Sequence, residues 1–180
     1  MNYFQLFEIS PKYFIDIKEL EKKFYELSRK MHPDKFQTKG LDEIKRATES
    51  YALLNKAFAT LKDPDDRAQY IFGLAQFKVS DSKKTLPPEL AEEYFNLQEA
   101  LEDDSQSENT KNLVKEFSLL VKNQVQSQNQ FQENAFKEWD NLKSPINKSA
   151  FPLFTKASHA ILQKNYLKSM AQDLERKFHS

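Results

Sequence analysis

The stretch Met31-His32-Pro33-Asp34-Lys35-Phe36 separates two segments that both have the apolar spacing of amphipathic helices. Pro33 lacks a backbone N–H and disfavours helical dihedrals at His32, so the first helix is predicted to end near Met31. His32 and Asp34 then lie on an exposed connection, where an imidazole and a carboxylate flank a rigid proline. A partner's arginine or backbone could bind such a pair. The alternative is an ordinary turn with a capping aspartate.

The helix before this loop is predicted to begin after Asp16, an N-cap residue with Glu19 three positions later. One side of the helix is apolar, with Leu20, Phe24, Leu27 and Met31 at spacings of three and four. The other side carries the basic residues Lys22, Lys23, Arg29 and Lys30. A basic helix face is commonly only solvated, but beside the loop we interpret this one as a docking surface.

After the loop, a helix is predicted to start near Asp42. Its apolar positions form a continuous packing seam of Ile44, Ala47, Tyr51, Leu54, Phe58 and Leu61. A short loop allows this helix to run antiparallel to the preceding one. Asp63 is then expected to cap a further helix with Pro64 at its first position. A short apolar helix or turn is expected at residues 3–7.

These elements resemble those of the J-domain family in order and spacing over residues 1–76. The resemblance rests on Tyr-Phe-x-Leu-Phe at 3–7, the basic helix, His-Pro-Asp-Lys-Phe at 32–36, the seam helix, and Leu-Lys-Asp-Pro-x-x-Arg-x-x-Tyr at 61–70. It implies a co-chaperone that stimulates the ATPase of a DnaK/HscA-type heat-shock chaperone. In that family the loop and the basic helix dock on the chaperone. The resemblance therefore assigns chaperone binding to His32, Pro33, Asp34, Lys22, Lys23, Arg29 and Lys30.

The rest of the chain is predicted to form a second helical domain. Residues 77–86 lose all periodicity and are interpreted as a linker, and Pro88 starts a helix with the apolar stripe Leu90, Tyr94, Leu97 and Leu101. A long helix is expected from about Thr110 to Leu142, with a core of Leu113, Phe117, Val121, Phe131, Ala135, Trp139 and Leu142. The last is expected from about Ser149 to Phe178. The prediction is thus all-α: a J-domain, then an antiparallel three-helix bundle over residues 87–180.

Two aromatic residues of this second domain lie away from the apolar stripes of their own helices. At 100° per residue, Phe95 is about 140° from the stripe of its helix, and Tyr166 is about as far from that of the last helix. Each ring is either packed against the first domain or exposed to a partner.

A J-domain, a short linker and a three-helix bundle together resemble the HscB branch of the family, the co-chaperones of iron–sulfur cluster assembly. The opening Asn-Tyr-Phe-x-Leu-Phe at 2–7 and the form His-Pro-Asp-Lys-Phe favour this branch. Its bundle carries the scaffold protein IscU and delivers it to the chaperone HscA. Matches at 95–101 and 165–167 imply that the scaffold contacts Ala91, Glu92, Phe95, Asn96, Glu99 and Tyr166, although the family has larger apolar residues at 91 and 92. The alternative is a J-domain co-chaperone with a different client.

Composition argues against other classes of function. The 27 basic and 27 acidic residues cancel, and residues 89–108 contain eight acids and no base, so no nucleic-acid partner is expected. The chain has no cysteine for a disulfide or a thiolate metal site and only two glycines, too few for a phosphate-binding loop. None of the three histidines has a metal-ligating residue three or four positions after it. We therefore expect no enzyme, no cofactor and no metal site.

The chain also shows no sign of a membrane segment. No apolar run approaches the roughly 20 residues that span a bilayer, and the first residues lack the basic start of a signal or transit peptide. A cytoplasmic protein without a membrane partner is the expectation.

Overall fold

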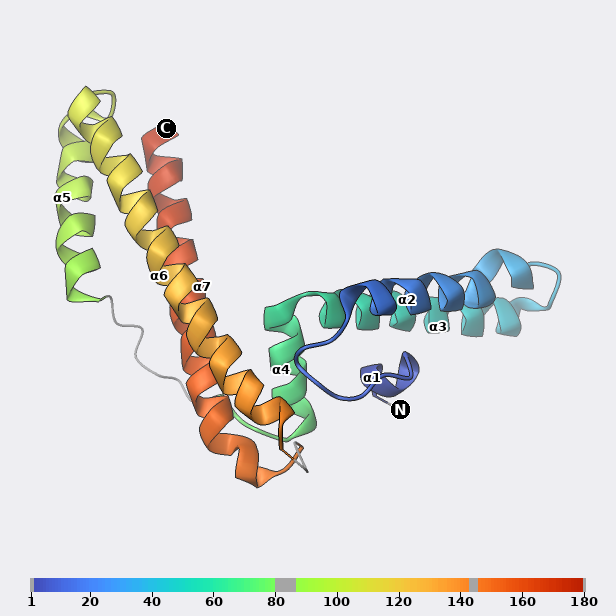
Figure 1. Ribbon diagram of the computed structural model, residues 1–180. Helices are drawn as coiled ribbons and strands as arrows, with labels where there is room; N and C mark the ends of the chain where they lie inside the picture. The colour runs from blue at the N-terminus through green and yellow to red at the C-terminus, as the bar shows by residue number, and fades with distance from the viewer. Residues whose placement is uncertain (1, 80–86, 143–145, 180) are drawn as a thin grey trace. The chain divides into compact units, whose positions relative to one another are not determined.

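A computed structural model describes residues 2–79, 87–142 and 146–179. Within these ranges every regular element is a helix, as expected (Figure 1). The chain forms two compact units, one of residues 1–78 with 140–149 and one of residues 79–139 with 150–180. Most of the predicted linker, residues 80–86, lies outside the described ranges. Residues 143–145, between the last two predicted helices, also lie outside them. The domain boundaries expected from the sequence therefore stay a prediction.

The first unit is built on an antiparallel pair of helices, α2 (Ile17–Met31) and α3 (Leu41–Lys62) (Figure 1). Asp16 caps α2 as expected, accepting hydrogen bonds from the amides of Lys18 and Glu19 at 2.8 and 3.1 Å. The predicted packing seam of α3 is confirmed along its central line. Three of its residues, each seven positions apart, are buried: Ala47, Leu54 and Leu61. Phe24 of α2 stacks on Phe58 of α3 with ring centroids 4.1 Å apart.

Two shorter helices, α1 (Tyr3–Leu6) and α4 (Pro64–Leu74), complete the first unit. Asp63 caps α4 through the amides of Asp65 and Asp66, as predicted. Arg67 is buried, and its Nη1 donates to the Leu61 carbonyl at 2.6 Å, which ties α4 to the end of α3. The Tyr70 hydroxyl accepts from the Tyr3 amide at 2.8 Å, and burial raises the pKa of Tyr70. Through these two contacts, α4 is joined to the end of α3 and to α1.

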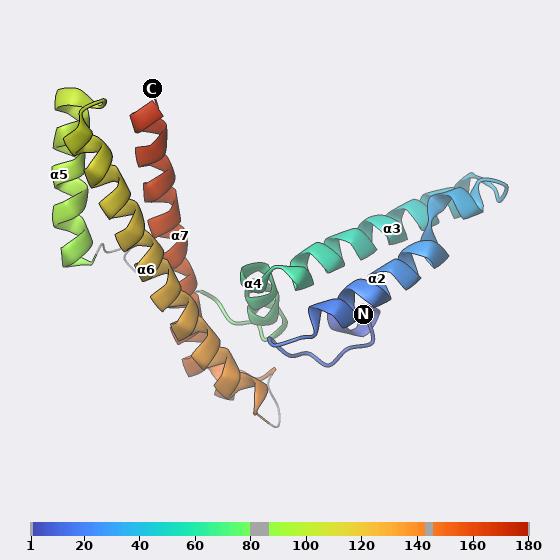
Figure 2. The ribbon, with the colours of Figure 1, turned by 45° about the horizontal axis from the view of Figure 1, so that its top comes forward.

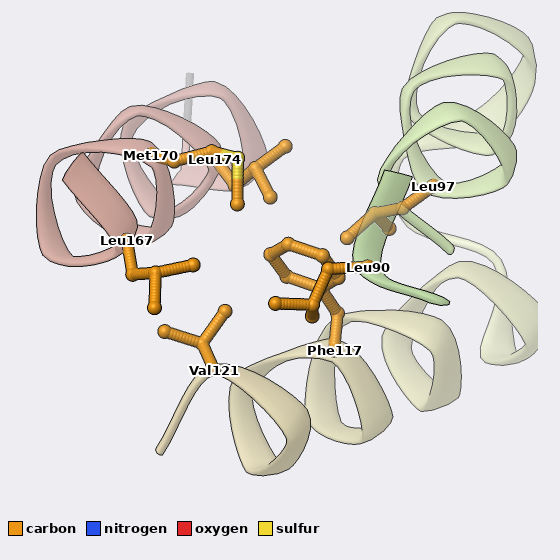
Figure 3. Close-up of a cluster of buried hydrophobic side chains, with 7 residues drawn as sticks. All are labelled: Leu90, Leu97, Phe117, Val121, Leu167, Met170 and Leu174. Atoms are coloured by element: carbon orange, nitrogen blue, oxygen red, sulfur yellow. The ribbon is translucent and has the colours of Figure 1, made fainter. Parts of the chain in front are cut away.

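The second unit is an up-down-up bundle of α5 (Pro88–Asp104), α6 (Glu108–Asp140) and α7 (Phe151–His179), as expected (Figure 2). Its main core brings side chains from all three helices together (Figure 3): Leu90, Leu97, Phe117, Val121, Leu167, Met170 and Leu174. Ser107 caps α6, since its Oγ accepts from the Thr110 amide at 3.0 Å. Lys177 of α7 donates to Gln98 Oε1 of α5 at 2.7 Å, which fixes the relative level of these two helices.

One core prediction for α6 is wrong. Phe131 was expected to be buried, but its side chain is 62 % exposed. The next residue, Gln132, is buried instead, and its Oε1 accepts a hydrogen bond from the buried Lys164 Nζ at 2.8 Å. The error is local, because the predicted core residues on either side of it, Val121, Ala135 and Trp139, are buried as expected.

Candidate functional site

The loop between α2 and α3 is more regular than the sequence suggests. His32 ends α2 and caps a short 3₁₀ helix, η1 (Pro33–Phe36), in an extended conformation with φ −61° and ψ 128°. Its Nδ1 accepts from the Asp34 amide at 3.3 Å and lies 3.4 Å from Asp34 Oδ2. Gln37 Nε2 donates to Asp34 Oδ1 at 3.3 Å. The imidazole and the carboxylate are thus held in a fixed relation at the tip of the hairpin.

The ring of Tyr51 on α3 packs against the His32 ring. The two ring centroids lie 5.2 Å apart at an interplanar angle of 70°, an edge-on contact. The Tyr51 hydroxyl also accepts from Ser28 Oγ of α2 at 3.3 Å. The sequence places Tyr51 only in the packing seam of α3, and its role as a support for His32 follows from the structure alone.

The His32 and Asp34 side chains remain accessible to a partner, with 43 % and 71 % of their surfaces exposed. When Nδ1 accepts from the Asp34 amide, the ring is neutral and carries its proton on Nε2. A protonated ring would instead pair with the Asp34 carboxylate. In either form the pair presents directed polar groups and no nucleophile, which suits recognition by a partner.

A hollow of about 340 Å³ adjoins the loop and extends this surface onto α3. Met31, Phe36 and Ala47 supply its apolar lining, and Lys30, Glu43, Arg46 and Ser50 its polar lining. Arg46 was not among the candidates from the sequence, because it lies on α3 and away from the basic face of α2. The hollow could accept an apolar side chain with acidic neighbours.

The basic face of α2 is divided by the structure. Lys22, Arg29 and Lys30 are exposed, whereas Lys23 is half-buried. Lys23 Nζ donates to the Glu8 carbonyl at 2.9 Å and pairs with Glu19 at 3.2 Å, so it holds α2 to the preceding turn. Three of the four predicted basic residues are therefore available to a partner, and the fourth is engaged within the unit.

Tyr25 is an exposed aromatic residue on the same face that sequence reasoning missed. It is 62 % exposed and lies three residues after Lys22 and four before Arg29, so the three side chains are neighbours on the helix. Exposed tyrosines flanked by arginine are frequent hot spots of protein interfaces. The sequence did contain a signal for the exposure of Tyr25, because the residue lies opposite the apolar stripe of Leu20, Phe24 and Leu27.

In the second unit, the five predicted residues of α5 form one exposed face, which we call the α5 face: Ala91, Glu92, Phe95, Asn96 and Glu99. They share a side of the helix, since 91, 95 and 99 are spaced by four and 92 and 96 likewise. Phe95 is 70 % exposed. The face is thus apolar at its centre and acidic at its edges.

Tyr166 of α7 is half-buried and lies at a different level from Phe95. Phe95 is three residues before Gln98 and Tyr166 is eleven before Lys177, the pair that joins α5 to α7. The eight-residue difference amounts to about 12 Å along the helices. The two rings therefore do not form one compact patch, although a single interface of about 800 Å² could cover both.

Comparison with known proteins places the first unit in a class. A model of the DnaJ domain matches residues 2–70, which include the basic helix, the loop and α3. With the antiparallel hairpin and its polar tip, this match defines the chain as a J-domain protein.

Curated relatives give the family within that class. The protein named co-chaperone protein HscB homolog from Photobacterium profundum is 30 % identical over 154 residues, 84 % of this chain and 90 % of the relative. Co-chaperone protein HscB of Proteus mirabilis is 30 % identical over 122 residues, 67 % of this chain and 70 % of the relative. The chain belongs to the HscB family of J-domain co-chaperones, as the sequence resemblance indicated.

Solved structures of the family share the fold. Chaperone HscB from Vibrio cholerae superposes with a TM-score of 0.64 at 24 % identity, covering 98 % of this chain and 96 % of the other. The human co-chaperone protein HscB gives a TM-score of 0.69 at 21 % identity, covering 98 % of this chain and 82 % of the other.

In the part of the chain that the structure describes, none of the helices combines the length and the apolar character needed to span a membrane.

Proposed function

We propose that this chain stimulates the ATPase of an HscA/DnaK-type chaperone and delivers an IscU-type scaffold protein to it for the maturation of iron–sulfur proteins. The loop surface, which we define as His32, Pro33, Asp34, Lys22, Arg29 and Lys30, contacts the chaperone. The α5 face and Tyr166 contact the scaffold. Lys23 is left out of the loop surface because it is engaged with Glu8 and Glu19.

The observation that carries the chaperone proposal is the fixed geometry of the loop. An exposed ring and carboxylate are held by a proline, a 3₁₀ turn and an aromatic support, so little entropy is lost on docking. The neighbouring cations attract an acidic partner and speed its association. Membership of the HscB co-chaperone family supports a chaperone ATPase as this partner.

Single-turnover ATP hydrolysis tests this proposal. The full chain should accelerate hydrolysis by an HscA/DnaK-type chaperone, and Asp34→Asn should abolish the acceleration. Because Asp34 is exposed and outside both packing seams, the free energy of unfolding should change by no more than about 0.5 kcal/mol. Full stimulation by Asp34→Asn would contradict the proposed role of the loop.

A co-chaperone with a different client is the second candidate. Calorimetric titration with an IscU-type scaffold distinguishes the two, because only the first predicts specific binding that depends on Phe95. The cytoplasmic location and the lack of a nucleic-acid partner stay predictions. Retention on heparin or DNA columns at moderate salt would contradict the second of these.

A further inference from the structure

Helix α5 packs beside only part of the length of α6 and α7. Helix α5 has 17 residues, against 33 in α6 and 29 in α7. At 1.5 Å per residue, α5 is about 26 Å long and α6 about 50 Å. Figures 1 and 2 show α6 and α7 continuing side by side well past the start of α5. Among the described residues of this unit, no third helix covers this stretch on the side that α5 covers elsewhere.

The face that α5 covers continues without a break into this stretch. On α7, Leu174, Met170 and Leu167 face α5 in the core, and the same spacing of four and three leads to Gln163, Ala160 and Lys156. On α6, Val121 of that core repeats at seven residues as Gln128 and Ala135. The residues of α6 and α7 that would face a third helix therefore continue beyond the N-terminal end of α5.

A groove of about 690 Å³ lies on this continued face. Its walls come from α6 and α7 and are Gln128, Phe131, Asn134, Ala135, Glu138, Thr155, Lys156, His159 and Ala160. Ala135 and Ala160 are small, almost fully buried residues that form part of the groove lining. Phe131 is 62 % exposed at the groove and offers it a large apolar surface. The groove thus has the shape and the apolar content that a helix requires.

The two walls carry opposite charges at one end of the groove. Glu138 is exposed on α6 and Lys156 is exposed on α7. The contact between Trp139 and Phe154, with ring centroids 5.8 Å apart, places these parts of the antiparallel helices at the same level. The described part of the chain provides no ion-pair partner for Glu138 or Lys156. A ligand with a cation on one side and an anion on the other would complement both.

We propose that this α6–α7 groove binds an amphipathic helix of a partner protein, which packs there as α5 packs on the adjoining stretch. The bound helix is about four turns long. Its apolar stripe covers Phe131, Ala135 and Ala160, with a basic residue beside Glu138 and an acidic residue beside Lys156. This site lies on other residues than the α5 face, so the proposal goes beyond the delivery of a scaffold.

A designed peptide tests the groove in the full-length protein. The peptide has 15 residues, leucines at spacings of three and four, and an arginine and a glutamate on opposite sides of the stripe. We expect binding at micromolar concentration by fluorescence anisotropy, and at least a tenfold loss with Phe131→Ser. Leu119→Ser is the matched control, because Leu119 is 58 % exposed on α6 and points about 120° away from Phe131. It should leave the affinity unchanged, and both variants should melt like the wild type.

A charge exchange then tests the orientation of the helix. Glu138→Lys should weaken the original peptide several-fold, and replacing the peptide's arginine by glutamate should restore its affinity. Absence of binding to the wild type at 1 mM peptide, or an equal loss from Leu119→Ser, would overturn the proposal. So would a dimer in sedimentation that Phe131→Ser dissociates, because a second copy of the chain would then be the occupant.

Discussion

The loop surface and the α5 face use different means to present side chains to a partner. In the loop, His32 and Asp34 are fixed by Pro33, by the 3₁₀ turn and by the edge of the Tyr51 ring. On α5, Phe95 projects from a regular helix, with 70 % of its surface exposed and no ring contact to the described residues. In the proposed complexes, the loop would use directed polar contacts, whereas the α5 face would bury apolar area.

This difference predicts that the two surfaces will respond to different perturbations. Directed polar contacts fail when one group is changed, because its partner is left buried and unsatisfied. An apolar contact loses affinity in proportion to the area removed, and it is little affected by salt. The predictions below separate the two surfaces by these properties.

The largest effect is expected from His32→Gln. Glutamine keeps a polar group but loses the ring that contacts Tyr51 and the Nδ1 that accepts from the Asp34 amide. Truncating a docked polar contact costs about 2–5 kcal/mol, so stimulation of the chaperone should be abolished, as it should be by Asp34→Asn. Single-turnover hydrolysis measures this. A calorimetric titration of the scaffold serves as the control and should be unchanged.

Phe95→Ala combined with Tyr166→Ala should reduce affinity for the scaffold at least tenfold, about 1.4 kcal/mol. An aromatic side chain buries about 150–250 Å² at an interface. Leu119→Ala is the matched control, since Leu119 is exposed on α6. A thermal melt separates the competing role, in which the rings pack within the protein. A clearly lowered melting temperature with unchanged affinity would favour that role.

These two surfaces also differ in how far the sequence predicted them. Asp16, Pro33 and Asp63 act on the local backbone, so the two ends of α2 and the start of α4 follow from single residues and were confirmed. The contact between Tyr51 and His32 joins residues on two helices, and no local rule shows it. Sequence reasoning likewise missed Tyr25, whose exposure depends on which side of α2 meets α3.

The error at Phe131 has a clear physical cause. An apolar residue at core spacing was preferred to the polar Gln132, yet Gln132 is buried because Lys164 donates a hydrogen bond to it. A buried amide paired with a lysine leaves no apolar signal in the sequence. The apolar stripe therefore predicted α6 and its buried Ala135 and Trp139 correctly, and was wrong at Phe131 alone among its predicted core positions.

A moderate effect is expected from Lys22→Glu combined with Arg29→Glu. Both cations are exposed and seven residues apart on α2, so the charge reversal should weaken chaperone docking several-fold. The wild-type affinity should itself fall as salt rises through the physiological range, where the Debye length is about 8 Å.

Lys115→Glu combined with Lys122→Glu is the matched control for this pair. These lysines are exposed on α6 with the same spacing of seven and give the same change in net charge. Docking that is insensitive to salt, or equal losses in the two double variants, would show that the basic face of α2 is only solvated.

The smallest effect is expected from Tyr51→Leu. The change removes the edge contact with His32 and the hydrogen bond from Ser28, which together should cost about 1–2 kcal/mol of stability. Stimulation should fall a few-fold, because His32 is less well held. Tyr51→Phe keeps the ring and should retain nearly full stimulation. A loss with Tyr51→Phe equal to that with Tyr51→Leu would assign the effect to the hydroxyl.

The most direct test of the account is ATP hydrolysis by the chaperone, measured with and without scaffold for three proteins. These are the wild type, Asp34→Asn, and Phe95→Ala with Tyr166→Ala. Asp34→Asn should give no stimulation under either condition. The double variant should match the wild type without scaffold and lose the additional stimulation that scaffold provides. Full stimulation by Asp34→Asn, or undiminished synergy in the double variant, would contradict the division of work between the loop surface and the α5 face.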